Sequence, residues 1–65
     1  MRPQKTMQMS EAQANQYLRQ VGAREHRQPM ADRKVYYSSA LKSWIQIMRS
    51  GNGFRVALYG DCPCS

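Results

Sequence analysis

The chain has 65 residues, with ten Lys and Arg against four Asp and Glu, so its net charge is +6. A chain of this length buries only about 60% of its surface on folding, which excludes a multidomain enzyme with a deep substrate cleft. Three Leu, two Ile, three Val and one Phe make nine strong core residues. That is about 14% of the chain, below the roughly 20% at which highly charged chains tend toward disorder. These figures indicate one small binding module with a thin core.

The N-terminal segment predicts an arm followed by a helix. Residues 1–9 are polar, contain Pro3 and lack a hydrophobic period, so we expect a flexible basic arm. Ser10 and Gln13 have the spacing of a capping box. The apolar residues that follow recur at i, i+3, i+4 and i+7, the pattern of one helix face; they are Ala14, Tyr17, Leu18 and Val21. The spacing predicts a helix over residues 10–21, ended by Gly22.

The middle of the chain predicts a loop, a strand and a second helix. Residues 23–33 are charged and polar and contain Pro29, which predicts a long loop and a site candidate. The segment 34–38 is rich in β-favouring residues and predicts a short strand. Ser38 or Ser39 can then cap a helix that ends at Gly51. Its apolar positions repeat the helical spacing, at Leu41, Trp44, Ile45 and Met48.

An alternative interpretation makes residues 44–49 a strand paired with residues 54–59. Asn52-Gly53 between these segments is typical of a hairpin turn. The helical spacing separates apolar from polar residues more cleanly, so we favour the helix. Residues 54–59 alternate and predict a strand with Phe54, Val56 and Leu58 facing inward. The expected fold is α+β, a small α-β-α-β domain over residues 10–60 with two amphipathic helices packed on a short antiparallel sheet. We expect residues 61–65 to form a flexible tail.

One segment resembles a known family. Residues 33–45 resemble the wing-then-helix segment of excisionase and MerR-type small winged-helix proteins, in which a basic strand precedes a Ser-capped helix. The resemblance covers 13 of the 65 residues. It implies DNA binding, but the family's recognition helix would fall on the Pro-containing segment 23–33.

Catalytic and metal-binding patterns are missing from the sequence. The carboxylates are scattered over caps, loops and tail, and a single His26 has no Ser or Asp partner in a plausible order for nucleophilic catalysis. Cys62 and Cys64 have one residue between them, which is closer than the usual zinc-ligand spacing. We therefore expect neither enzyme activity nor a metal or other cofactor.

The basic residues are the more informative signal. Seven of the ten are Arg, which favours bidentate recognition of phosphate or carboxylate. On the expected second helix, Lys42, Gln46 and Arg49 share a polar face that could contact phosphates and base edges. The tyrosines Tyr36, Tyr37 and Tyr59 could stack on bases, although core positions are their commoner role. The candidate binding residues are Arg24, Arg27, Arg33, Lys34, Lys42, Gln46 and Arg49.

Two functions fit this surface. The first is a small nucleic-acid-binding regulator of phage or plasmid type. The second is a phage-type inhibitor or adaptor that presents its basic surface to an acidic host protein and blocks a nucleic-acid-binding site. The sequence has no apolar run long enough to span a membrane and no secretory signal, so we expect a cytoplasmic protein without a membrane partner. The thin core suggests self-association or folding completed by a partner.

Overall fold

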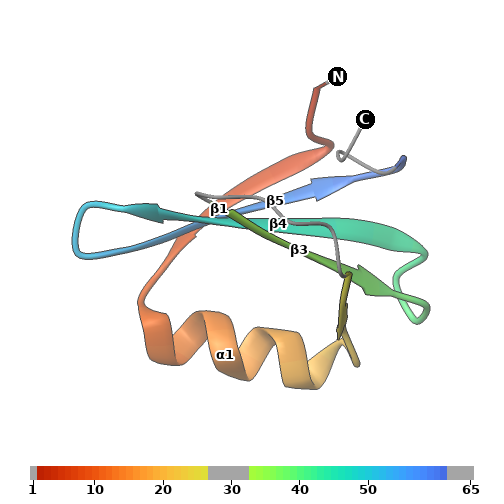
Figure 1. Cartoon of the computed structure of the whole chain (residues 1–65), viewed down its shortest axis with the longest axis horizontal. Coiled ribbons are helices and arrows are strands. Elements are labelled where there is room, and N and C mark those ends of the chain that lie inside the picture. The colour runs from red at the N-terminus through yellow and green to blue at the C-terminus, as the bar shows by residue number, and fades with distance from the viewer. Residues whose placement is uncertain (1, 27–32, 62–65) are drawn as a thin grey trace.

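The computed structural model describes residues 2–26 and 33–61, which form one helix and five strands (Figure 1). The elements are β1 (Lys5–Met9), α1 (Glu11–Gln20), β2 (Arg24–Glu25), β3 (Arg33–Ser38), β4 (Ser43–Ser50) and β5 (Gly53–Tyr59). The strands form one antiparallel sheet in the order β1-β5-β4-β3-β2. The α+β class is confirmed, but the described chain has one helix rather than two. Of the expected flexible tail, residues 62–65 lie outside the part of the chain that the structure describes.

Helix α1 begins as its sequence predicts. The Ser10 hydroxyl accepts a hydrogen bond from the Gln13 backbone N–H, and the Gln13 side chain accepts one from the Ser10 N–H. This capping box satisfies two backbone donors that the first turn would otherwise leave unpaired. Glu11 in the first turn and Arg19 in the last both suit the helix dipole. Gly22 follows with φ +63°, a left-handed conformation that glycine adopts without strain.

The prediction of a second helix is wrong, because residues 43–50 form strand β4 between β5 and β3. Ile45 and Ile47 face α1, while Trp44, Gln46 and Met48 point to the other face. The central residues are buried on both faces, including the polar Gln46, so burial does not alternate along the strand. Leu41, which completed the helical spacing, is exposed in the turn between β3 and β4. The winged-helix resemblance fails with the helix.

Strand β1 was also not predicted. Residues 5–9, assigned to a flexible arm, pair with β5 from Lys5 opposite Leu58 to Met9 opposite Phe54. Met7 and Met9 are half-buried against the core. This strand has only these two apolar residues of its own, and its position depends on a partner far along the chain.

The β4–β5 hairpin uses a two-residue turn at Gly51 and Asn52. Gly51 has φ +60°, and Asn52 does not have a positive φ. A glycine at the first central position with this geometry is typical of a type II′ turn, which matches the twist of the strands. The hairpin alternative was therefore correct, although Gly51 rather than Gly53 supplies the left-handed residue.

The core lies between α1 and one face of the sheet (Figure 1). Its buried members are Ala14 of α1, Ile45 and Ile47 of β4, and Val56 of β5. The helix packs mainly over β1 and β5, so the β3 side of this face is covered less. Among the described residues, no helix is long and apolar enough to cross a membrane.

Candidate nucleic-acid interface

The sheet face opposite α1 carries the candidate interface. No helix covers this face within residues 2–26 and 33–61 (Figure 1). Strand side chains alternate between faces, so the register of the ladder arranges those on the uncovered face in three rows. None of the described strand residues that point to this face is acidic.

The first row crosses four strands and is largely aromatic. Arg24 pairs with Tyr37, Tyr37 with Trp44, and Trp44 with Tyr59. The Tyr37 and Trp44 ring centroids are 4.9 Å apart, and their planes are tilted by 58°. The ring of His26 meets Trp44 edge-on at 5.2 Å. The contacts with these two rings position Trp44 in an aromatic platform.

The platform is positioned by its backbone and by its neighbours. His26 follows β2, and its backbone N–H donates to the Val35 carbonyl at 2.7 Å, which extends the β2–β3 ladder. Tyr37 is 38% exposed and Trp44 and Tyr59 are half-buried, so the row presents aromatic surface to solvent. Each base has a π-face, so exposed aromatic rings bind single-stranded nucleic acid with little dependence on sequence.

The second row is small and buried, and the third is basic. Val35, Gln46 and Ala57 form the buried row. One step further along the strands, Arg33 pairs with Met48 and Met48 with Arg55, while Gln8 lies opposite Arg55. The aromatic and basic rows are four residues apart, about 13 Å along the strands.

Two of the predicted binding residues belong to this surface, and a third lies in a turn at its edge. Arg24 ends the aromatic row and is exposed. Arg33 lies in the basic row and is half-buried. Lys42 is exposed in the β3–β4 turn, two residues before Trp44, and has φ 53°. The structure thus brings cations to the aromatic row and to the parallel row beyond it.

The remaining predicted residues lie elsewhere. Lys34 and Arg49 are exposed on the face that carries α1. Gln46 is only 4% exposed and lacks the exposure that base reading requires. Because β4 is a strand, the helix face that was to join Lys42, Gln46 and Arg49 does not exist. Arg27 lies outside the described residues.

The sequence analysis missed Trp44 and Arg55 as interface residues. The helical interpretation placed Trp44 in the core, and the strand prediction left Arg55 without a partner. Alternation along 44–48 and 55–59 was the signal that could have found both, once the two segments were paired as a hairpin.

No family model, curated protein or solved structure matches this chain.

Proposed function

We propose that this protein is a small non-enzymatic regulator that binds single-stranded nucleic acid on the uncovered face of its sheet. The observation that carries the proposal is the aromatic row Arg24–Tyr37–Trp44–Tyr59 beside a parallel row with Arg33 and Arg55. Bases would stack on Tyr37 and Trp44, and the cations on either side would neutralise the phosphates.

The geometry favours a single strand over a duplex. Paired bases are stacked inside a duplex and do not offer their faces to a protein, whereas unpaired bases do. The face lacks a protruding helix in its described part, so it offers no recognition helix to a major groove.

Trp44 supplies a direct test because it is the only tryptophan of the chain. Titration with a single-stranded oligonucleotide should quench its fluorescence, whereas a duplex of equal charge should quench it much less. Trp44→Leu should weaken binding about tenfold, because stacking on an aromatic residue contributes roughly 1–3 kcal/mol per base. Trp44→Phe, followed by fluorescence anisotropy of a labelled strand, should retain most of the affinity.

The cations are tested by the salt dependence of binding. Each phosphate contact to a single strand contributes about −0.7 to the slope of log K against log salt. Arg24→Ala combined with Arg55→Ala should therefore make the slope shallower by about 1.4. The matched control is Lys5→Ala with Arg19→Ala, which removes the same charge from residues outside this face and should leave the slope almost unchanged.

The alternative partner is an acidic host protein. Polyglutamate of matched charge is the simplest substitute for such a surface. Equal affinity for polyglutamate and for the single strand, with no effect of Trp44→Leu, would contradict the proposal. Retention of one host protein from nuclease-treated lysate, lost in the Arg24 and Arg55 double variant, would favour the inhibitor or adaptor function instead.

A further inference from the structure

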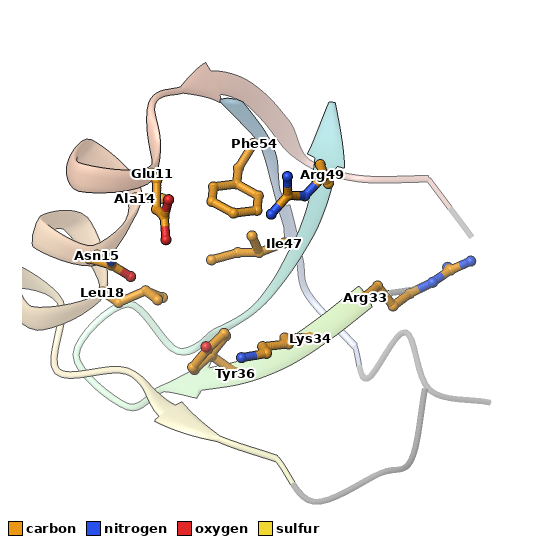
Figure 2. A pocket seen from close by; sticks show the side chains of 10 residues that line it. All are labelled: Glu11, Ala14, Asn15, Leu18, Arg33, Lys34, Tyr36, Ile47, Arg49 and Phe54. Atoms are coloured by element: carbon orange, nitrogen blue, oxygen red, sulfur yellow. The ribbon is translucent and has the colours of Figure 1, made fainter. Parts of the chain in front are cut away.

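A groove lies on the other face of the sheet, between α1 and strands β3 and β4 (Figure 2). It exists because the helix packs over β1 and β5 and leaves the β3 side less covered. Its volume is about 330 Å³, which is near the lower end of the range for small-molecule sites.

The floor of the groove is apolar. Ile47 and Phe54 come from the sheet, and Ala14 and Leu18 come from the helix. Tyr36 lies beside them on β3 and packs against the core (Figure 2). An organic ligand could therefore bury an apolar body of roughly the size of one aromatic ring and a short chain.

Charged groups surround this floor unevenly. Arg49 places its guanidinium carbon 5.7 Å from the centroid of the Phe54 ring, a cation–π contact that holds it at the edge of the groove. Lys34 pairs with Ile47 and extends over the floor from β3 (Figure 2). Glu11 faces them from the first turn of α1. Arg33 borders the groove at its outer end, but its side chain belongs to the basic row on the opposite face. Among the described side chains that face the groove, Arg49 and Lys34 thus outnumber the single carboxylate.

We infer that this groove binds a small amphipathic monocarboxylate, with its apolar body on the Leu18–Ile47–Phe54 floor and its carboxylate between Arg49 and Lys34. Arg49 and Lys34 donate charge-assisted hydrogen bonds to the carboxylate oxygens. Glu11 offsets part of the positive charge and so disfavours a dianion such as a phosphate monoester. The inference uses side chains on the opposite face from the proposed nucleic-acid interface and does not rest on that function.

The test uses phenylbutyrate and its neutral analogue phenylbutyramide as probes, titrated into the full ¹⁵N-labelled chain without nucleic acid. Phenylbutyrate should shift the amides of Leu18, Ile47 and Phe54. It should bind about a hundredfold more tightly than phenylbutyramide, as expected for two charge-assisted contacts that each contribute about tenfold.

Three variants separate charge from shape. Arg49→Gln and Lys34→Gln should each weaken phenylbutyrate about tenfold and leave phenylbutyramide unchanged. Glu11→Gln should strengthen phenylbutyrate by a few-fold, the opposite direction. Arg19→Gln removes a charge from the exposed end of α1 and serves as the matched control. Circular dichroism and thermal melting verify that each variant is folded.

Several results would overturn the inference. They are equal affinity for the acid and the amide, shifts centred on Trp44 rather than on the groove, or no shift at millimolar probe. Trp44→Leu should bind phenylbutyrate like the unmodified chain, so failure of the nucleic-acid proposal and failure of this one give different results.

Discussion

Gly53 occupies a position that leaves no room for a side chain. A Cβ built at this position would collide with the backbone carbonyl of Met9 on the adjacent strand β1. The carbonyl belongs to a paired strand and cannot move without disturbing the ladder. Gly53 therefore allows β1 and β5 to approach at the end of the hairpin.

Gly53→Ala should lower the free energy of unfolding by about 1–3 kcal/mol, the usual effect of forcing extra volume into a packed site. Urea denaturation measures the change. Gly60→Ala is the matched control, because among the described residues a Cβ there closely meets the end of the flexible Gln4 side chain, at 2.9 Å, rather than backbone. Equal stability of the two variants would show that the strands separate at no cost.

Ser38 is the other residue with a specific local role. Its hydroxyl is fully buried, donates to the Val21 carbonyl at 2.6 Å and accepts from the Leu41 N–H at 3.2 Å. It thus links the end of α1 to the β3–β4 turn. The sequence analysis placed Ser38 as a possible helix cap; it does satisfy a turn N–H, but in a hairpin.

Ser38→Ala should destabilise the protein by about 1–3 kcal/mol, because two partly buried backbone groups lose their hydrogen-bond partner. Ser43→Ala removes a more exposed hydroxyl that donates only to the Leu41 carbonyl at 3.1 Å, and should cost less than about 1 kcal/mol. Thermal melts of both variants give the comparison, and a larger loss for Ser43→Ala would refute this assignment.

At the scale of elements, local sequence patterns predicted those helices and strands whose formation depends mainly on residues nearby in the sequence. The capping box fixed the start of α1, and alternation gave β5. The hairpin turn between residues 50 and 53 indicated the pairing of β4 with β5, but no local pattern indicated its pairing with β3. Ile45 fits both interpretations, since it has helical spacing with Leu41 and Met48 and strand spacing with Ile47.

The rates of amide hydrogen exchange should rank the strands by the number of neighbouring strands to which each is hydrogen-bonded. The backbone of β4 is bonded to strands on both sides, whereas β2 has two residues and one described partner strand. We expect the amides of Ile45 and Ile47 to exchange slowest and that of Glu25 among the fastest. Nuclear Overhauser contacts between Ile47 and Val56 would accompany this ranking; slow exchange limited to α1 would contradict it.

At the scale of the whole molecule, strand β4 serves two surfaces through its alternation. Trp44 and Met48 contribute to the uncovered face, while Ile47 and Arg49 contribute to the groove under the helix. Composition predicted a basic binding module but not this division. The number of charged residues can be read from the sequence, whereas the sheet face on which each charge lies depends on the register of the strands. The mistaken helix at 38–50 therefore assigned Lys42, Gln46 and Arg49 to a shared face.

The pairing of Lys5 with Leu58 has a consequence for how the protein is made. The ribosome synthesises β1 before the other described strands and its partner β5 after them, so β1 waits without this neighbour and with Met7 and Met9 uncovered. The long sequence separation of this contact places the fold among those that form slowly and only once distant segments meet. A chain interrupted before Gly53 would lack β5. It would also leave β1 unpaired, because β5 is the one described strand that pairs with β1.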